Sequence, residues 1–377
     1  MGAPIRVAQV MGYMDGGGVE QVVMNYYRHI DRSRVQFDFL VCEGSGMVPR
    51  EEIESMGGRV FMVPPYKQLI RYMREMERLF REERWPIVHS HVNTLSVFPL
   101  RAAKRAGVPV RIAHSHSTSG GHDPAKNAMK ALLRPLSNVY PTHRAACSRH
   151  AGEWLFGKGH DFTVIPNAID LASFWFDPVR REAVRQGLGV EDGQLVVGHV
   201  GRFSPPKNQS ALVRSFALVA ERRPDARLVL VGEGRQRADV EALAASLCPE
   251  GSVLFLGQRD DVADLYQAFD VFCLPSEYEG LGMVAVEAEA AGLPCVLSSA
   301  VPRDADPTRT AIFLDANSEG DWAKTMASII PGERIQAYLE DFTEYDIRDA
   351  SKTLGRMYLS LLPKCIIGDF VLSKGSK

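Results

Sequence analysis

The sequence contains few cysteines, and they are not placed as partners for one another. There are six in 377 residues, scattered along the chain without a C-x-x-C pair. Zinc motifs and the disulfide frameworks of small secreted domains both need closely or regularly spaced cysteines. The sequence therefore predicts neither, and a reducing cytoplasm is the expected location.

Long hydrophobic runs are also absent. No apolar stretch approaches the roughly 18 residues that indicate a transmembrane helix. The amino terminus, MGAPIRVAQV, leads into a strand-like segment and lacks the apolar core of a signal peptide. We therefore expect a chain that does not span a membrane.

Neither sign of charge is in large excess, because the formal net charge is only −2. The halves differ, however: residues 1–175 contain 22 Lys and Arg against 16 Asp and Glu, and residues 176–377 contain 22 against 30. Such a split is often only solvated surface. Alternatively, residues 66–84 and 126–134 contact an anionic surface, either lipid headgroups at the inner face of the plasma membrane or a phosphorylated acceptor. No basic cluster is interleaved with aromatic residues, so nucleic acid is not an expected partner.

Short apolar segments alternate with helical patterns throughout the chain, which predicts parallel βα units in two domains. The strands expected in the first domain are Ile5–Val10, Gln36–Val41, Arg59–Val63, Ile87–His91, Val110–His114, Ala145–Ser148 and Thr163–Ile165. Those expected in the second are Leu195–Val200, Arg227–Val231, Val253–Leu256, Val271–Leu274 and Pro294–Ser298, with Ala311–Leu314 at an edge. The predicted fold class is α/β, with two Rossmann-like doubly wound parallel sheets.

Domain boundaries follow from the places where this alternation stops. We predict an N-terminal domain at 1–170, a linker at 171–194, a second domain at 195–340, and a C-terminal helix and tail at 341–377. The helical period near the C-terminus puts apolar side chains on one face, so this helix needs a surface to pack on. Because open α/β sheets bind ligands at the carboxyl ends of their strands, the working site is expected in a central cleft between the domains.

The most specific motif lies in the segment Pro275–Pro294, PSEYEGLGMVAVEAEAAGLP. A strand is expected to end near Ser276 and a helix to begin near Met283. Glu287 then shares a helical face with small apolar residues, which predicts a poorly hydrated carboxylate, whereas Glu289 is expected to be solvated. Vicinal ribose hydroxyls would suit Glu287 as partners, and the alternative is an ion pair with a neighbouring arginine.

Glycines at the start of this helix predict a phosphate site. Gly280 and Gly282 allow close approach of a ligand to the backbone, and the first amides of a helix point toward an anion. We therefore expect a phosphate on the amides from Gly280 to Val284. Glu279 is expected to accept hydrogen bonds from sugar hydroxyls, and the alternative is a solvated loop residue.

A second motif, GRFSPPKN at 201–208, follows an expected strand and opens a helix. Arg202 and Lys207 flank the amino terminus of that helix, where cations and the helix dipole add. A diphosphate is the expected ligand. The alternative is that both residues are surface cations.

Two features of the first half are less specific. Gly16, Gly17 and Gly18 lie between a strand and a helix, where phosphate or sugar could approach the backbone, although they match neither G-x-G-x-x-G nor a P-loop. Histidines gather in HSH (89–91) and AHSH (113–116), each at the carboxyl end of an expected strand. A third ligand for H-x-H is not apparent, so a sugar contact by His116, or second by His114, is expected rather than a metal.

Taken together, these motifs resemble glycosyltransferase family 4. The matching elements stand in the family's order along nearly the whole chain: GGGVE (16–20), AHSHS (113–117), IPNAID (165–170), GRFSPPKN (201–208), VGEG (231–234), FLGQRDDV (255–262) and E-G-x-G-x-x-x-x-E (279–287). RIAHSHS and VPRDAD make the resemblance closest to bacterial capsular and exopolysaccharide enzymes. The resemblance implies a GT-B fold and retaining transfer from a nucleoside-diphosphate sugar, first of all a UDP-sugar, without an essential metal or other cofactor.

The resemblance also implies roles for individual residues. As catalytic residues, Glu279 would contact donor-sugar hydroxyls, Arg202 and Lys207 the diphosphate, and His116 the transferred sugar, while Glu287 would bind the ribose. The other implied donor-binding residues are Gly17, Gly18, Gly257, Arg259, Gly280, Leu281, Gly282, Met283 and Val284. The final helix would cross back onto the N-terminal domain. The sequence departs from the family's pattern at Asn167-Ala168 and Pro205-Pro206, and neither departure removes a catalytic group.

The expected reaction is transfer of a hexosyl-type sugar to a glycan or lipid-linked acceptor in bacterial surface polysaccharide synthesis. No carboxylate nucleophile can be named, so a same-face, oxocarbenium-like substitution is expected, in which the leaving phosphate helps to deprotonate the acceptor. Two alternatives stay open at this point. A GT-B-fold sugar-nucleotide epimerase would need acid and base carboxylates against the sugar, and a non-catalytic sugar-nucleotide-binding subunit could tolerate loss of Glu279 or His116.

Overall fold

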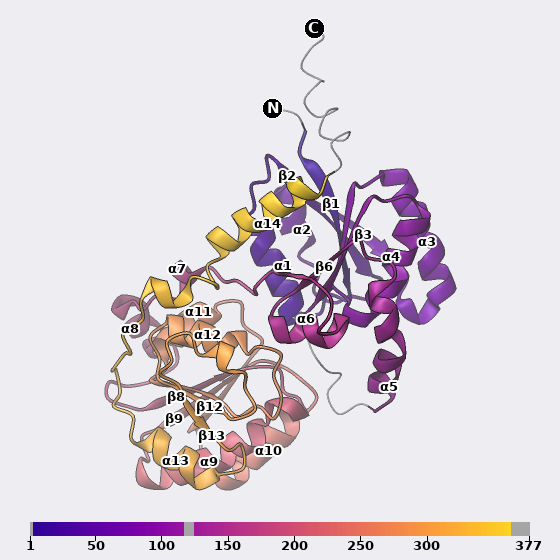
Figure 1. Ribbon diagram of the computed structural model, residues 1–377. Coiled ribbons are helices and arrows are strands. Elements are labelled where there is room, and N and C mark those ends of the chain that lie inside the picture. Colours follow the sequence, from indigo (N-terminus) through magenta and orange to yellow (C-terminus); the bar gives the residue numbers. More distant parts are fainter. Residues whose placement is uncertain (1–2, 117–123, 363–377) are drawn as a thin grey trace. The chain divides into compact units, whose positions relative to one another are not determined.

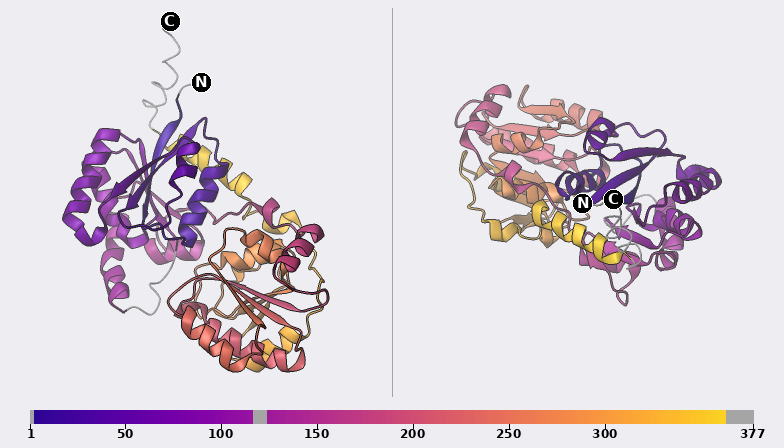
Figure 2. Two further views of the ribbon diagram at one scale, coloured as in Figure 1. Left: turned by 180° about the vertical axis from the view of Figure 1, so that it is seen from behind. Right: turned by 90° about the horizontal axis from the view of Figure 1, so that it is seen from above.

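A computed structural model describes residues 3–116 and 124–362, which divide into two compact units (Figure 1). The first unit comprises the chain up to Ile169 together with the chain from Glu344 onward, and the second unit is Asp170–Thr343. Each unit is built on one parallel sheet with helices on both of its faces, as the views of Figure 2 show. The predicted fold class is confirmed.

The first unit has a seven-stranded parallel sheet in the order β3-β2-β1-β4-β5-β6-β7. Its strands are β1 Ile5–Gly12, β2 Val35–Cys42, β3 Arg59–Val63, β4 Ile87–Ser90, β5 Val110–Ser115, β6 His143–Ala146 and β7 Thr163–Val164. Its α-helices are α1 Gly18–His29, α2 Arg50–Ser55, α3 Leu69–Glu83, α4 Val97–Arg105, α5 Pro124–Leu133, α6 Arg149–Phe156 and α14 Ile347–Leu361. All expected strands of this half overlap observed ones.

Both faces of this sheet are covered, which explains why β1 and β2 are apolar at most positions. On one face, Tyr26 of α1 and Leu354 and Tyr358 of α14 pack into one core with Phe37 of β2. On the other face, α3 and α4 cover the sheet. The C-terminal helix therefore completes the core of the first unit, although the whole second unit, Asp170–Thr343, lies between it and β7 in the chain.

The second unit has a six-stranded parallel sheet in the order β10-β9-β8-β11-β12-β13. Its strands are β8 Val196–Val200, β9 Arg227–Val231, β10 Val253–Gly257, β11 Val271–Leu274, β12 Cys295–Ser298 and β13 Ile312–Leu314. Its α-helices are α7 Leu171–Phe174, α8 Pro178–Gly187, α9 Gln209–Arg222, α10 Arg237–Leu247, α11 Val262–Ala268, α12 Met283–Ala290 and α13 Glu319–Ala327. The strand order reverses between β8 and β11, so the loops that follow these two strands lie side by side.

Residues 171–194, expected as a linker, instead form α7 and α8 and belong to the second unit. The buried carboxylate of Asp270 anchors α8. It accepts hydrogen bonds from Arg181 Nη2 at 2.6 Å, Arg185 Nη1 at 3.3 Å and the Val196 amide at 2.7 Å. The linker was expected here because the strand–helix alternation stops, but two arginines of α8 find a counter-charge in Asp270 once the chain has folded.

Part of the predicted tail, residues 363–377, lies outside the described residues, as does Ser117 of the AHSHS motif. Over residues 3–116 and 124–362, no helix is both long and apolar enough to cross a bilayer.

Candidate active site

The loops after β8 and β11 bring together two of the predicted site residues. Lys207 Nζ lies 2.5 Å from Glu279 Oε1, and Ser276 Oγ donates a hydrogen bond of 2.7 Å to the same oxygen. The two loops are tied by their backbones, because the Glu277 amide donates to the Pro206 carbonyl at 2.8 Å. Both charged side chains are mostly buried, with 21% of the Lys207 side chain and 10% of the Glu279 side chain exposed. Glu279 is therefore not a solvated loop residue, and Lys207 is not a free surface cation.

Arg202, the other predicted cation, behaves differently. Its side chain is exposed, and within the described part of the chain it forms no ion pair. Its backbone carbonyl accepts a hydrogen bond from Gln209 Nε2 at 3.0 Å, which fixes the start of the loop. The loop thus presents one cation that is already held by a carboxylate and one that extends into solvent.

The amino terminus of α12 presents backbone amides next to this pair. Gly282 is the N-cap residue and adopts φ +91°, a left-handed conformation that favours glycine. The first amides of a helix have no partner within the helix, and no acceptor for the Met283 or Val284 amide is found among the described residues. Gly280 is partly exposed and Leu281 is buried. The Met283 and Val284 amides are therefore available to an anion, which is the ligand that the motif predicts.

Glu287 lies one turn further along α12 and has no arginine partner among the described residues. Tyr266 Oη donates to Glu287 Oε2 at 3.0 Å and also to the Val284 carbonyl at 3.0 Å. Burial raises the pKa of Glu287 to about 7, although the Tyr266 hydrogen bond and the charge of Lys207 lower it. Glu287 is therefore poised between its protonated and ionised forms at neutral pH. Tyr266 carries no motif, and sequence reasoning missed it.

Glu289 was expected to be solvated, and this is wrong. It is 1% exposed and accepts hydrogen bonds at Oε2 from the Thr308 amide at 3.0 Å and from Thr308 Oγ1 at 2.7 Å. Burial raises its pKa to about 8. The helical period predicts that only one face of α12 is buried. The segment after β12 also packs against α12, however, and buries the opposite face.

Gly257 and Arg259, predicted to border the base, lie at the end of β10 and just after it. Gly257 has φ +67°, and its carbonyl accepts a hydrogen bond from the Gly232 amide at 2.8 Å, which joins the ends of β9 and β10. Arg259 is exposed and forms a two-point ion pair with Asp261, at 2.7 and 2.5 Å. The segments that follow β8, β9, β10 and β11 all lie at the carboxyl edge of this sheet, because the four strands are parallel.

The glycine turn before α1 in the first unit is already occupied by a carboxylate. Glu20 Oε2 accepts hydrogen bonds from the Gly16 amide at 2.6 Å and the Gly17 amide at 2.8 Å. A Cβ on Gly17 would lie 3.0 Å from Glu20 Oε1, whereas a Cβ on Gly18 would meet nothing within 4 Å. An anion that binds the Gly17 amide must displace Glu20, so Gly18 is the more open of the two predicted positions.

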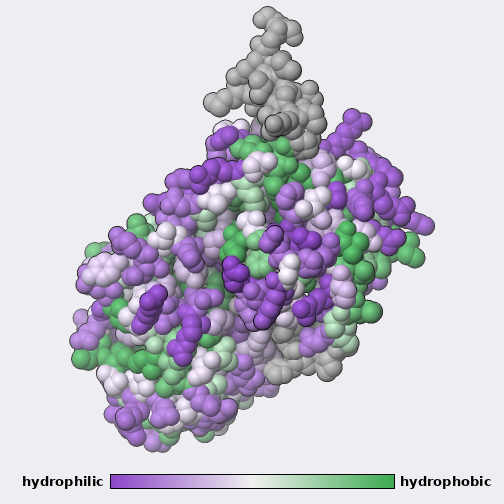
Figure 3. Space-filling view, in the orientation of Figure 1, coloured by the Kyte–Doolittle hydropathy of each residue, from purple (hydrophilic) through white to green (hydrophobic). Residues whose placement is uncertain are grey.

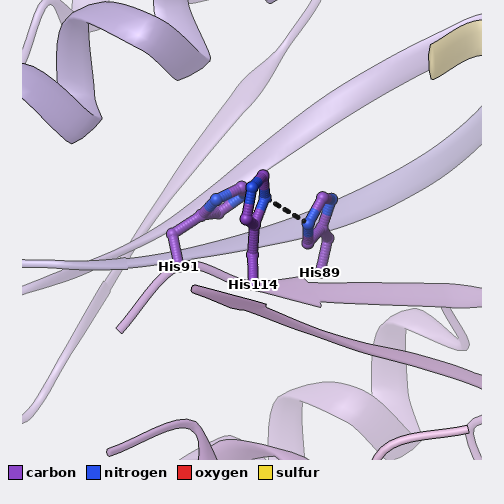
Figure 4. Close-up of side chains that lie close together, drawn as sticks. All are labelled: His89, His91 and His114. Carbon is purple, nitrogen blue, oxygen red and sulfur yellow. Dashed lines mark hydrogen bonds between the residues drawn. The ribbon is translucent and has the colours of Figure 1, made fainter. Parts of the chain in front are cut away.

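The predicted histidines gather in a buried cluster. His116 is 7% exposed and His114 2%, and their rings stack with centroids 3.9 Å apart. His91 and His89 complete the cluster. His91 Nδ1 lies 2.8 Å from His116 Nε2. His89 Nε2 lies 3.0 Å from His114 Nδ1, the contact drawn as a dashed line in Figure 4. Burial lowers the pKa of His116 to about 3, so the rings are neutral at physiological pH.

Two residues far away in the sequence orient this cluster, and no motif pointed to them. Gln9 Oε1 lies 2.8 Å from His91 Nε2, and Tyr358 Oη lies 2.7 Å from His89 Nδ1. In contrast, Nδ1 of His116 and Nε2 of His114 are buried without a hydrogen-bond partner among the described residues. Leaving such an atom unpaired costs about 1–3 kcal/mol, so the cluster is built to meet a further group.

Comparison with known proteins agrees with this architecture. The family described as "Glycosyltransferase Family 4" matches residues 16–173, and the one described as "Glycosyl transferases group 1" matches residues 180–346. EpsF of Bacillus subtilis (strain 168), named as a glycosyltransferase, is 36% identical over 333 residues, which cover 85% of this chain and 87% of EpsF. The UDP-Gal:alpha-D-GlcNAc-diphosphoundecaprenol alpha-1,3-galactosyltransferase of Escherichia coli is 27% identical over 312 residues, with 78% and 79% covered.

Solved structures show the same fold. HepE of Anabaena, crystallised in complex with UDP and glucose, superposes with a TM-score of 0.78 at 21% identity, covering 94% of this chain and 100% of HepE. Sucrose-phosphate synthase of Thermosynechococcus elongatus gives a TM-score of 0.73 at 18% identity, covering 95% and 99%. The two parallel-sheet units and the loops at their carboxyl edges define a glycosyltransferase of the GT-B type. The chain belongs to glycosyltransferase family 4.

Proposed function

We propose that this glycosyltransferase moves a hexosyl-type sugar from a nucleoside-diphosphate sugar, first of all a UDP-sugar, to a glycan or lipid-linked acceptor, with retention of configuration. The observation that carries the proposal is the Lys207–Glu279 pair beside the free amides of α12. A cation with a helix amino terminus suits a diphosphate, and a carboxylate at the same place suits sugar hydroxyls.

Binding of the donor would separate the Lys207 side chain from the Glu279 carboxylate. Lys207 Nζ turns from Glu279 to a phosphate oxygen, and the freed Glu279 carboxylate accepts hydrogen bonds from hydroxyls of the donor sugar. The amides from Gly280 to Val284 hold the distal phosphate, Arg202 adds the second cation, and Glu287 binds the ribose. The base would lie along Gly257 and Arg259.

The transfer step needs stabilisation of the leaving group. The bond between the anomeric carbon and the phosphate oxygen breaks, and the acceptor oxygen forms its new bond on the same face. The acceptor proton passes to the departing phosphate oxygen. Fixed cations and amides are worth most where negative charge develops, so Lys207, Arg202 and the α12 amides can serve without an essential metal at the diphosphate.

The first unit is proposed to contribute the acceptor side and part of the sugar contact. The Nδ1 atom of His116, which has no partner among the described residues, would accept a hydrogen bond from a hydroxyl of the transferred sugar. Gly18, or Gly17 once Glu20 has moved, would lie near the sugar's phosphate. His114 is the less suitable of the two histidines because it is more deeply buried, with 2% of it exposed against 7% of His116.

Relatives favour a bacterial surface polysaccharide as the product. The Escherichia coli relative is named for a UDP-sugar donor and a diphosphoundecaprenol-linked acceptor, and HepE was crystallised with UDP and glucose. RIAHSHS and VPRDAD point to capsule and exopolysaccharide synthesis. The relatives and the two motifs fit an enzyme that works in the cytoplasm, peripherally at the inner face of the plasma membrane.

The function is tested with a panel of UDP-, GDP- and ADP-sugars and undecaprenyl-diphosphate-linked sugar acceptors. We expect a UDP-sugar to support transfer, the product to keep the donor's anomeric configuration by NMR, and Mg²⁺ or Mn²⁺ not to raise the rate of EDTA-dialysed protein. Glu279→Gln should lower the rate at least about 100-fold. Donor binding without transfer to any acceptor would favour a binding subunit, and conversion of the donor to an epimer without acceptor would favour an epimerase.

Donor affinity should depend on pH through Glu287. If the ionised carboxylate binds the ribose hydroxyls, a pKa of about 7 means that affinity is high above pH 7 and is lost as pH falls through 7. Between pH 8 and pH 6 the ionised fraction falls about 10-fold, and calorimetry with UDP-glucose should show a matching loss. Tyr266→Phe removes a hydrogen bond that lowers this pKa, so its midpoint should move to higher pH.

The Glu287→Gln variant is the control for this pH profile, since it cannot titrate at this position. Its affinity should be weaker and flat over the same range. An unchanged pH dependence in Glu287→Gln would assign the titration to another group and remove Glu287 from the ribose site.

A basic and apolar surface on the first unit is proposed as the membrane contact. Along α5 and the segment after it, Met129, Leu132, Leu136 and Val139 are exposed, with Leu132 at 77%, and Figure 3 shows hydrophobic surface over this region. Lys130 and Arg134 lie on the same segment. Apolar side chains flanked by cations are typical of surfaces that bind anionic bilayers.

Vesicle binding should therefore depend on salt and on these two cations. Each basic residue near an anionic surface contributes about 1 kcal/mol, so K130E/R134E should weaken sedimentation with phosphatidylglycerol vesicles at least about 10-fold at low salt. K352E/R356E, with the same charge change on α14, should bind like wild type. Equal loss in both variants, or no binding at low salt, would remove this surface from the proposal.

A further inference from the structure

Four imidazoles lie on one side of the first unit's sheet, at the carboxyl ends of β4 and β5. His89 and His91 are two residues apart, as are His114 and His116, and side chains two apart along an extended chain point to the same side. The strands are neighbours in parallel register, with Ser90 opposite Ala113. Two H-x-H pairs that are separate in the sequence therefore become one group in the fold.

Three of these rings have the arrangement of a metal site. His89, His91 and His114 can each direct one ring nitrogen so that the three nitrogens lie within 4.8 Å of one another. Figure 4 shows the three rings side by side above their strands. Zn–N bonds of about 2.0–2.1 Å in a tetrahedron separate the nitrogens by about 3.3 Å. His89 Nε2 and His114 Nδ1 are already 3.0 Å apart, so a small expansion would admit an ion.

The surrounding hydrogen bonds set the tautomers that a metal requires. Gln9 Oε1 can only accept, so His91 carries its proton on Nε2 and has its lone pair on Nδ1. That lone pair lies 2.8 Å from His116 Nε2, and an ion would replace this contact. Tyr358 Oη receives a hydrogen bond from Gln9 Nε2 at 3.2 Å and can accept another from His89 Nδ1, which puts the lone pair of His89 on Nε2. That lone pair lies 3.0 Å from His114 Nδ1, and an ion would replace this contact. Metal-bound histidines usually donate their other ring N–H to such a partner.

The charge state and the available space agree with this arrangement. His89 and His114 are buried, with 1% and 2% exposed, and burial favours the neutral imidazole that a metal ligand requires. The rings line a cavity of about 10 Å³, together with Gln9 and Tyr358, which has room for one small group. The Nε2 atom of His114 is buried without a hydrogen-bond partner among the described residues, so it can carry the ring proton while Nδ1 binds the ion.

We propose that His89, His91 and His114 bind one divalent transition-metal ion of the zinc class, with Gln9 and Tyr358 holding the ligand rings in place. The ion would tie β4 to β5 and, through Tyr358, to α14. The metal site lies in the first unit and the proposed diphosphate site in the second. A test of metal binding is therefore independent of the transfer reaction.

The direct test is the metal content of the full chain, produced without a polyhistidine tag in zinc-supplemented medium. Mass spectrometry of the metals should find about one zinc ion per chain. H89N and H114N should lose most of it. H199N should keep it, because His199 is a fully buried histidine of the second unit that bonds the Cys273 carbonyl instead.

A second measurement covers variants that fail to fold. Metal-free wild-type chain is titrated with Co²⁺, and a folded tetrahedral site should give intense visible absorption that added Zn²⁺ abolishes. Metal should also raise the midpoint of thermal unfolding. Wild-type chain that purifies without metal and develops no visible Co²⁺ bands, while its circular dichroism shows it folded, would overturn the proposal.

Discussion

Replacing Lys207 with alanine should lower kcat/KM for sugar transfer by about 100- to 1,000-fold, the usual effect of removing one fixed donor from a developing negative charge. The side chain is mostly buried and is held at Glu279 before any ligand arrives, so little reorganisation is needed when the leaving phosphate takes over its contact. Lys207→Arg should recover only part of the rate, because a planar guanidinium does not replace a point charge in a confined place.

Two comparisons separate this loss from structural damage. Lys324→Ala removes an exposed lysine from α13 of the same unit and should leave transfer unchanged. In K207A/E279Q no unpaired buried carboxylate is left, so folding should match wild type while transfer stays low. Transfer within about threefold of wild type in Lys207→Ala would show that the diphosphate is bound elsewhere.

Replacing Asp270 with alanine should lower the free energy of unfolding of the second unit by about 3–5 kcal/mol, since it leaves two arginines without their buried counter-charge. Arg181 and Arg185 of α8 both contact this carboxylate, and the amides of Val196 and Gly332 donate to it at 2.7 and 2.9 Å. The change would release α8 from the sheet as well as weaken the start of β8.

Urea unfolding gives the midpoint, and hydrogen exchange read by mass spectrometry reports the second unit alone. Exchange should become faster in α8 and β8 and stay unchanged in β1 and β4 of the first unit. Asp225→Ala, at an exposed position before β9, should change stability by less than about 0.5 kcal/mol. A loss below about 1 kcal/mol for Asp270→Ala would mean that solvent, rather than Asp270, compensates these arginines.

Local sequence patterns predicted much of the fold, and they placed two site candidates in loops that the structure brings together. Every expected strand overlaps an observed one, because parallel strands covered on both faces read as apolar runs. The structure brings Lys207 and Glu279 into contact because both lie in loops that follow strands, and β8 and β11 are neighbours at the switch in strand order.

The errors arose where a residue's environment comes from distant parts of the chain. Glu289 lies on the helical face that the period assigns to solvent, but Thr308 and its loop cover that face. Glu20 occupies the amides of the glycine turn, which the motif alone left open for a ligand. Residues 171–194 looked like a linker because Asp270, the partner of their arginines, lies about 90 residues further on.

The sequence by itself determined the two parallel sheets, the family, and which motifs stand at the carboxyl ends of strands, because these depend on short-range periodicity and on residues close together in the chain. Only the tertiary structure decided which charges are buried and which side chains meet. Each H-x-H pair lacks a third ligand in the sequence, and the pairing of β4 with β5 supplies it. The physical reason is that burial, hydrogen-bond partners and pKa shifts are properties of packed neighbours, and packing joins residues that the chain keeps apart.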